Sequence, residues 1–297
     1  MALSTQDQAL RYQFADMISM NLANTKSRIR PRLRNIKQQN GSVAFWDGLD
    51  GLDSYEIIGR NQETQNTDAN HTRRRMVSRR FATSILLDKK DSIEMIVDPT
   101  SPYAKRMAEA LMTRFDKLFF YYATATVTLG LETTTTKTFA ADGGKTVDLT
   151  GGITYEGLLP IPENFIDAGV DLATTKVFFA GTGQENTAFM KEQELTSGDF
   201  TRQFAVERGS VTNIMGMETI YFPRLAKNGD VLSETSSVRN CLAFSEDAVA
   251  VGIGSEIDVR ITEESTRNFS KQVWADMIVS FVRTEGGHVQ LVQTPVV

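Results

Sequence analysis

The sequence predicts an α+β protein, and three observations support this class. Apolar residues recur at helical spacing over residues 101–123, which predicts one long helix. Short runs rich in β-branched and aromatic residues lie between residues 176 and 293, which predicts several separate strands. Two basic segments, at residues 26–37 and 60–80, contain too few apolar residues to form a core. We therefore expect a folded α+β body that carries extended segments.

The totals are those of an ordinary soluble protein. The chain has 297 residues, of which 41% are apolar and 23% are charged, and this length allows a sizeable core. No apolar run approaches the roughly 18 residues of a membrane-spanning helix, and the first residues lack the layout of a signal peptide. Cys241 is the only cysteine, which excludes an intramolecular disulfide. We expect an intracellular protein with no membrane contact.

The beginning of the chain has the character of a basic arm. Residues 1–40 carry seven basic and two acidic side chains, a balance of +5, whereas the whole chain has a net charge of −5, so the remainder carries −10. Apolar spacing over residues 5–22 predicts an amphipathic helix. The basic run at residues 26–37 is interrupted by Pro31 and has little to bury, which indicates an extended segment. A basic arm attached to an acidic body is expected.

A second segment without a core covers residues 46–97. Asp-Gly pairs begin it, and a polar stretch at residues 60–71 follows. If residues 73–80 form a strand, arginines occupy both of its faces, so we do not expect it in the core of a compact monomer. A two-stranded ribbon of this kind is marginally stable alone. The pattern predicts support from another chain.

The helix at residues 101–123 has the clearest pattern. Ser101 can cap it and Pro102 suits its first position. Charged residues between the apolar positions, Asp116 among them, are expected on the surface. The apolar stripe consists of Ala104, Met107, Ala108, Leu111, Phe115, Leu118, Phe119 and Tyr122.

The rest of the chain reads as alternating short elements. Residues 132–152 predict a loop or hairpin insertion, and the last predicted strand is expected to fold as a hairpin about Glu285–His288. Helices are expected near residues 154–168 and 184–194. Strands are expected at residues 176–180, 242–252, 257–262 and 277–293.

Few residues are available for a catalytic or metal site. His71 and His288 are the only histidines and lie far apart in the sequence, which argues against a serine triad or a histidine-based metal site. Gly181-Thr182-Gly183 lacks the third glycine of a dinucleotide-binding motif, and no phosphate-binding loop occurs. We therefore expect no enzymatic activity, no metal and no cofactor.

The two basic segments admit three interpretations. A solvated face is the ordinary one. Nucleic-acid binding would explain the arginines but not the acidic body, and the aromatic residues typical of single-strand binders are missing from residues 60–80. Pairing with carboxylates of neighbouring subunits explains both features, because guanidinium groups suit interface ion pairs. The inter-subunit contact candidates are Arg28, Arg30, Arg34, Arg73, Arg74, Arg75, Arg79 and Arg80.

Several short strings lie along the chain in a distinctive order. Arg73-Arg74-Arg75-Met76-Val77 leads to Asp98-Pro99-Thr100-Ser101-Pro102-Tyr103 directly before the long helix. The strings at residues 195–200, 209–211, 215–217 and 239–252 follow. In their order and spacing they resemble the HK97-fold major capsid proteins of tailed, particularly short-tailed, bacteriophages, and the resemblance covers nearly the whole chain. Each string alone carries little information.

The resemblance implies an organisation in five parts. They are an N-terminal arm at residues 1–45, an extended E-loop region at 46–97, the peripheral (P) domain with its spine helix 101–123 at 98–164, the axial (A) domain at 165–256, and strands returning to the P domain at 257–297.

The resemblance also implies a function. A virion subunit of this family self-assembles through hexamers and pentamers, in the host cytoplasm, into an icosahedral capsid around double-stranded DNA. The implied partners are a scaffolding protein, a portal protein and, in some phages, a decoration protein. The chain lacks the extra N-terminal length of a fused scaffolding domain, so we expect a separate one. No lysine lies between residues 46 and 88, so the covalent E-loop crosslink of some relatives is not expected.

Two alternatives stay open from the residues alone. The first is an encapsulin-type cargo shell, which has the same fold. The second is a nucleic-acid-binding protein that uses the basic arm.

Overall fold

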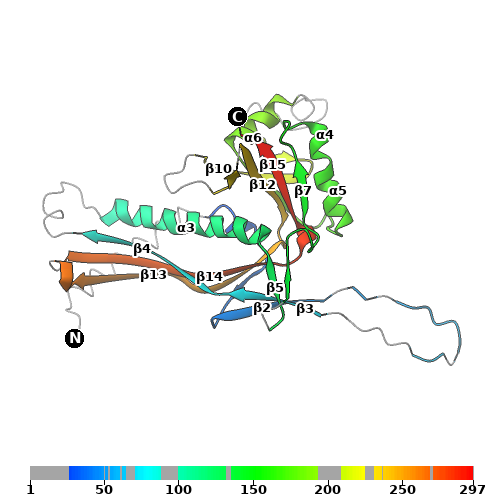
Figure 1. Cartoon of the computed structure of the whole chain (residues 1–297), viewed down its shortest axis with the longest axis horizontal. Coiled ribbons are helices and arrows are strands. Elements are labelled where there is room, and N and C mark those ends of the chain that lie inside the picture. The colour runs from blue at the N-terminus through cyan, green and yellow to red at the C-terminus, as the bar shows by residue number, and fades with distance from the viewer. Residues whose placement is uncertain are drawn as a thin grey trace.

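The structure is a computed structural model that describes residues 27–49, 51–52, 54–60, 62–64, 71–87, 100–131, 135–192, 209–224, 231–235, 237–267 and 270–296. The predicted helix at residues 5–22 and the string at residues 195–200 lie outside these ranges. The described residues form a mixed α+β fold built on three sheets (Figure 1). The predicted fold class is confirmed.

A four-stranded sheet and a long helix form the elongated half of the molecule (Figure 1). The order of its strands is β1 (Ile36–Gln38), β13 (Val249–Glu264), β14 (Ser270–Arg283) and β4 (Arg79–Leu87). The short helix η2 (Ser265–Arg267) joins the antiparallel pair β13 and β14, whereas β1 runs parallel to β13. Helix α3 (Thr100–Thr124) packs against β14, β4 and β13, which confirms the predicted long helix.

A seven-stranded sheet forms the other half. In spatial order its strands are β7 (Lys145–Asp148), β15 (Val289–Pro295), β12 (Val238–Ser245), β8 (Val177–Thr182), β10 (Met217–Phe222) and β9 (Asn213–Ile214), with β11 (Glu234–Thr235) on β12. The helices of this half are α4 (Tyr155–Leu158), α5 (Pro160–Asp167) and α6 (Gly183–Lys191). Helix α6 packs on β8 and β10, and α5 packs on β7. The predicted helices near residues 154–168 and 184–194 and the strand at 176–180 are confirmed.

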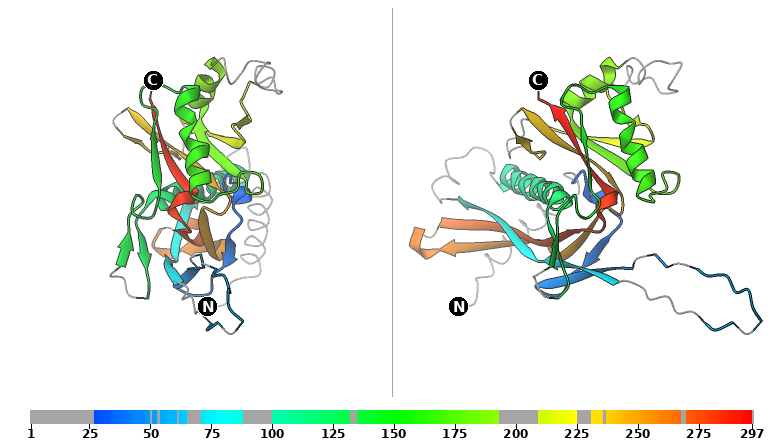
Figure 2. Two further views of the ribbon diagram at one scale, coloured as in Figure 1. Left: turned by 90° about the vertical axis from the view of Figure 1, so that its right-hand side faces the viewer. Right: turned by 45° about the vertical axis from the view of Figure 1, so that its right-hand side comes forward.

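A third, smaller sheet lies at the base of a projecting loop. Its strands are β2 (Val43–Leu49), β3 (His71–Val77), β5 (Val127–Leu129) and β6 (Thr135–Lys137). Strands β2 and β3 pair in antiparallel fashion. The described residues between them are irregular and extend away from the body, as Figure 1 and the right view of Figure 2 show. Within the described residues, the ribbon predicted for this region is paired only at its base. In the segment 132–152, predicted as a loop or hairpin insertion, β6 forms a hairpin with β5, whereas β7 is a strand of the seven-stranded sheet.

Helix α3 joins the two larger sheets through aromatic contacts. The ring of Phe115 lies 5.0 Å from that of Phe281 on β14, and the ring of Phe119 lies 4.8 Å from that of Phe244 on β12, both edge-on. All four rings are buried, and truncating such a ring costs about 3–5 kcal/mol. Asp116 is buried on the same helix, so its predicted place on the surface is wrong. Its burial follows from a contact with the arm that the helical pattern does not reveal.

Two predicted strands differ from the structure because the chain changes sheets within them. The strand predicted at 242–252 is two strands, with β12 in the seven-stranded sheet and β13 in the four-stranded one. The predicted hairpin about Glu285–His288 is wrong, because β14 and β15 also belong to different sheets and do not pair. A turn containing η3 (Gly286–His288) separates them. Gly286 is required there, since a Cβ atom would lie 2.2 Å from the carbonyl oxygen of Asp142. The segment 257–297 therefore contributes strands to both sheets.

Candidate interaction surfaces

The described part of the arm is anchored to α3 through a buried polar contact. The hydroxyl of Ser27 and the backbone N–H of Arg28 both donate to the carboxylate of Asp116. The Ser27 oxygen in turn accepts from the backbone N–H groups of Ile29 and Arg30, which begins the turn η1 (Arg30–Arg32). Burial raises the pKa of Asp116 to about 6, although these hydrogen bonds favour the carboxylate form. Asp116 therefore fixes where the arm leaves the body.

The arginines of the arm have partners within their own chain. Arg30 forms an ion pair with Glu256 on β13, and Arg34 lies near Glu246 and Asp247, at 3.8 and 3.7 Å. The guanidinium of Arg28 donates to the carbonyl of Tyr221 on β10. Pairing of the arm with acidic residues was expected between subunits, whereas the pairs that the structure shows lie within one subunit. Whether these three arginines also reach a neighbouring subunit stays a prediction.

The base of the projecting loop carries two arginines with opposite surroundings. Arg73 forms an exposed pair with Asp47 on β2, with 2.6 Å between its Nε and a carboxylate oxygen. Arg74, on the other face of β3, is buried and binds Asp142 at 2.7 Å. The guanidinium of Arg74 is thus enclosed within the subunit. Arg74 would have to leave Asp142 to contact a neighbour, so that contact stays a prediction and has the least support of the eight.

Asp142 is shared by two buried arginines, Arg74 and Arg283. The Nε of Arg283 lies 2.9 Å from the carboxylate, and its Nη1 donates to the carbonyls of Ala123 and Ala125 at the end of α3. Burial opposes ionisation of Asp142, but the hydrogen bonds from both arginines hold its pKa below the ordinary value. Burial lowers the pKa of Arg283. This junction ties the loop base to the end of α3 and to β14.

Of the remaining three candidates, Arg79 and Arg80 lie on β4 and Arg75 lies on β3. Arg80 forms an ion pair with the buried Asp276 on β14 and stacks over Trp274. Arg79 stacks over the ring of Tyr122 on α3, with 5.8 Å to its centroid. Arg75 has a buried Nε with no hydrogen-bond partner among the described residues. In the part of the chain that the structure describes, Arg75 and Arg79 form no ion pair with a carboxylate.

The sequence-based reasoning missed the apolar side chains of the projecting loop. Ile57 and Ile58 are 70% and 85% exposed, and Leu49, Leu52 and Tyr55 are exposed as well. Clustered exposed apolar groups mark interaction sites on soluble proteins. An Ile-Ile pair beside a glutamate, within an otherwise polar segment, was the signal available in the sequence.

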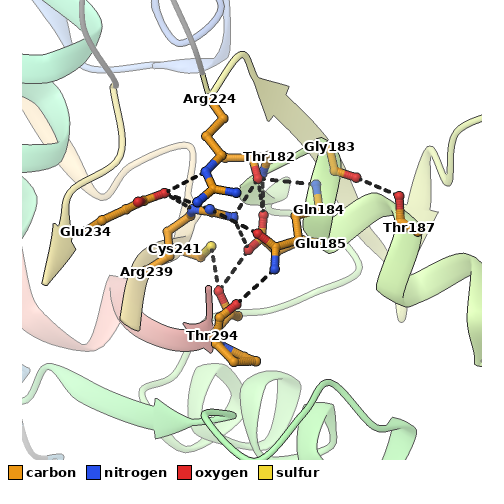
Figure 3. Close-up of polar contacts among 11 residues, drawn as sticks. Thr182, Gly183, Gln184, Glu185, Thr187, Arg224, Glu234, Arg239, Cys241 and Thr294 are labelled. Atoms are coloured by element: carbon orange, nitrogen blue, oxygen red, sulfur yellow. Dashed lines mark hydrogen bonds and ion pairs between the residues drawn. The ribbon is translucent and has the colours of Figure 1, made fainter. Parts of the chain in front are cut away.

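A second buried ionic centre lies in the seven-stranded half (Figure 3). Arg239 on β12 is fully buried between Glu185 on α6, at 2.7 Å, and Glu234 on β11, at 2.6 Å. Thr182 and Thr294 also bond to this centre, and Thr182 and Glu185 form a capping box at the start of α6. Every side chain of this cluster therefore has a structural partner.

One arrangement has the composition of a hydrolytic triad but not its accessibility. The hydroxyl of Ser245 lies 2.8 Å from Nδ1 of His288, whose Nε2 lies 3.5 Å from Glu285. Ser245 is 0% exposed, so its oxygen cannot reach a substrate. Among the described residues, no three His, Cys, Asp or Glu gather as a metal site. No helix in the same part of the chain is long and apolar enough to cross a membrane.

These features together define a class of protein. The polar clusters of the body are sealed within its core, whereas a long loop exposes aliphatic side chains to water. An exposed aliphatic patch of this kind marks an interaction surface, which is typical of a subunit of an assembly.

Comparison with known proteins identifies the family. The model of the family described as phage capsid protein matches residues 7–293, so the chain belongs to this family. As a member of this family it is a structural subunit of the phage capsid, located in the virion. No curated protein matches the chain.

Solved structures show the same HK97-type fold at low sequence identity. The capsid protein of Cyanophage P-SCSP1u is 13% identical with a TM-score of 0.70, over 91% of this chain and 88% of that one. The capsid protein of Ralstonia phage GP4 is 11% identical with a TM-score of 0.64, over 92% of each chain. A chain from the capsid of a native GTA particle, computed with C5 symmetry, is 10% identical with a TM-score of 0.62, over 91% of this chain and 90% of that one.

Proposed function

We propose that this chain builds the capsid of a tailed, short-tailed phage by assembling into hexamers and pentamers around double-stranded DNA. The observation that carries the mode of assembly is the projecting loop, whose Ile57 and Ile58 are exposed far from their own core. The order of the sequence strings supports a short-tailed phage. In this proposal the loop lies over an adjacent subunit and the arm lies under another.

The domain scheme implied by the sequence is part of the proposal. The N-terminal arm (1–45) is supported by η1 and β1 lying along the body. The E-loop region (46–97) is supported by the loop between β2 and β3. Of the proposed P domain (98–164), α3 packs on the four-stranded sheet, whereas β7, α4 and α5 belong to the seven-stranded half. The proposed A domain (165–256) supplies β8 to β12 of the seven-stranded sheet and the beginning of β13.

The arginine contacts differ in strength of support. Arg75 and Arg79 are the stronger inter-subunit candidates, because their guanidinium groups have no carboxylate partner in the described part of the chain. Arg28, Arg30, Arg34, Arg73 and Arg80 would first have to share or exchange an existing partner. Exchange of that kind costs little at exposed sites, where an ion pair contributes about 0–1 kcal/mol.

The shell is proposed to be held by non-covalent contacts. No lysine is present between residues 46 and 88 to form an E-loop crosslink. Denaturing gels of mature particles should therefore show the monomer alone, and a covalent ladder would contradict this. A separate scaffolding protein, a portal protein and, in some particles, a decoration protein are the proposed partners. Correct closed shells from this chain expressed alone would remove the need for the scaffolding protein.

Electron microscopy of the purified protein tests the proposal. We expect closed particles with five-fold and six-fold capsomers, and a small non-assembling species would contradict it. Deleting residues 1–26, which keeps Ser27, η1 and β1 in place, should leave a soluble subunit that cannot close shells. Normal particles from that deletion would refute the role of the arm.

A further inference from the structure

A positively charged groove runs along helix α3, between the helix, the start of β4 and the segment at residues 231–233. It has a volume of about 340 Å³, and a second hollow of about 210 Å³ continues it along the helix. Arg79, Arg114 and Lys117 line the first hollow, and no carboxylate is found among the described lining residues of either. The other polar lining side chains are hydroxyls and one amide, those of Tyr121, Tyr122, Thr124, Ser233 and Asn240. The groove is therefore cationic in a chain whose net charge is −5.

Arg114 differs from arginines such as Arg30 and Arg260, which form ion pairs with carboxylates of their own chain. It lies over the ring of Phe81, with 5.0 Å to the centroid, and forms no ion pair within the described residues. A guanidinium that stacks on a ring keeps N–H donors available at its edge. The side chain of Arg114 is also exposed. It can therefore donate to an anion that comes from outside the subunit.

The donors of the groove follow one face of the helix. Arg114, Lys117 and Tyr121 lie at positions i, i+3 and i+7 and so project from the same side of α3. Seven residues of helix span about 10 Å, and the phosphates of one DNA strand advance by about 3.4 Å each along the duplex axis. Phosphate oxygens accept hydrogen bonds from arginine, lysine and tyrosine side chains. The stripe thus matches about three successive phosphates in charge, in donors and in length.

The four-stranded sheet separates this groove from the projecting loop. Phe281 on β14 packs on Phe115 of α3, whereas the next residue, Val282, packs on the opposite face with Met76 of β3. Figure 1 shows the helix and the base of the loop on opposite sides of the sheet. The arm is anchored to α3 itself. In the proposed function the loop lies over one neighbour and the arm under another, so α3 faces the interior of the shell.

We propose that Arg114, Lys117 and Tyr121 form a contact for the phosphates of the packaged double-stranded DNA, with one strand following the groove along α3. This inference rests on the proposed function and names the surface of the subunit that meets the genome. A duplex is wider than the groove, so its phosphates meet the rim, where Arg114 and Tyr121 are exposed. Contacts to phosphates alone have no sequence preference, which suits a shell around a whole genome. Arg79 stays an inter-subunit candidate and is not part of this contact.

The salt dependence of DNA binding by the purified full-length subunit tests the contact. Each neutralised phosphate contributes about 0.9 to the slope of log K against log salt. Arg114→Gln combined with Lys117→Gln should lower this slope by about two and weaken binding of a short fluorescent duplex by about tenfold at low salt. Arg114→Lys keeps the charge and should keep the slope. The basic arm is present in every variant, so its own contribution cancels.

A matched control removes the same charge elsewhere. Arg73→Gln combined with Arg260→Gln replaces two exposed arginines that lie on the small sheet and beside Trp274, away from the α3 face. This variant should bind the duplex with the slope of the unmodified chain. An equal fall in the control would show that net charge alone sets the affinity, which overturns the contact.

The other outcomes assign the groove to one partner. A groove variant with an unchanged slope overturns the DNA contact, and if it also fails to incorporate the scaffolding protein, the groove holds an acidic protein segment instead. Both results leave the capsid function standing. Failure of the unmodified chain to form particles overturns the function, whatever the free subunit binds.

Particles of the unmodified chain give a second readout that needs no substitution. Reconstructions of DNA-filled particles by electron microscopy should show density against Arg114 and Tyr121, and particles emptied of DNA should lack it. Density that persists in emptied particles, or its absence from filled ones, would contradict the contact. This comparison decides the question if the groove variant does not fold.

Discussion

The arm and the projecting loop are both rich in polar residues, but only the arm packs on the body of its own subunit, where Ile29 and Leu33 are buried. The arm lies on the body, pinned by Ser27 to Asp116 and by ion pairs such as Arg30 with Glu256. The loop leaves the body, fixed only at its base through Arg74 and Asp142, and exposes Ile57 and Ile58. The polar groups of the arm have hydrogen-bond and ion-pair partners within one chain. The aliphatic side chains of Ile57 and Ile58 on the loop, in contrast, are exposed to water. This difference supports the proposal that the loop, more than the arm, is the segment that contacts a neighbouring subunit.

The largest expected effect is on assembly through the loop. Replacing Ile57 and Ile58 with aspartate should abolish particles, because the segment could no longer bury its apolar surface on a neighbour. The thermal midpoint of the free subunit should not change, since neither side chain packs on its own body. Ile166→Asp serves as the matched control and should assemble normally. Normal particles from the loop variant, measured by sedimentation and microscopy, would show that the loop is dispensable.

The next largest effect concerns the fixed base of the loop. Asp142→Asn should destabilise the subunit by about 3–5 kcal/mol, because it leaves the buried Arg74 and Arg283 without their counter-charge. Urea unfolding of the purified subunit measures the change. Asp47→Asn at the exposed Arg73 pair is the control and should alter the midpoint little. Equal effects of the two substitutions would contradict the distinction between the buried and the exposed pair.

The sequence predicted the positions of helices and strands well, but it did not predict which strands pair in one sheet. The spacing of apolar residues predicted α3 within a residue at each end, and the two alternating helices and β8 were located correctly. Periodicity could not show that β12 and β13, or β14 and β15, belong to different sheets. A strand that crosses between sheets has the same local pattern as one that does not.

The contact between the arm and α3 gives a pH-dependent prediction. Burial raises the pKa of Asp116 from 3.8 to about 6. A carboxyl that binds its proton more tightly when folded favours folding below its unfolded pKa, and this contribution is lost as the pH rises through about 6. Asp116→Asn does not titrate, so between about pH 5 and about pH 7 it should gain about 1 kcal/mol relative to the unmodified chain. Urea unfolding of both proteins at the two pH values checks this, and a constant difference would contradict it.

The smallest expected effect is that of an exposed ion pair of the arm. Arg30→Gln removes the pair with Glu256, which is partly exposed, and should cost no more than about 1 kcal/mol. The cost should shrink at high salt, because exposed charges are screened. Unfolding at low and high salt measures both quantities. A larger loss that is insensitive to salt would mean that the arm is held more firmly than its contacts indicate.

The arginine candidates show where reasoning from the sequence stops. The basic arm and the acidic body were correctly seen as complementary, but composition does not say whether complementary charges lie in one chain or in two. Arg73 and Arg74 are neighbours in the sequence but lie on opposite faces of β3. For this reason Arg74 is buried against Asp142, whereas Arg73 is exposed and pairs with Asp47. Ile57 and Ile58 were passed over because two apolar residues in a polar segment are a weak pattern until their exposure is known.

A reconstruction of assembled particles by electron microscopy would show directly whether the projecting loop contacts a neighbouring subunit. We expect the loop between β2 and β3 of each subunit to reach the adjacent subunit of the same capsomer, with Ile57 and Ile58 buried on it. A loop folded back on its own subunit, or one left in solvent within a closed shell, would contradict this contact.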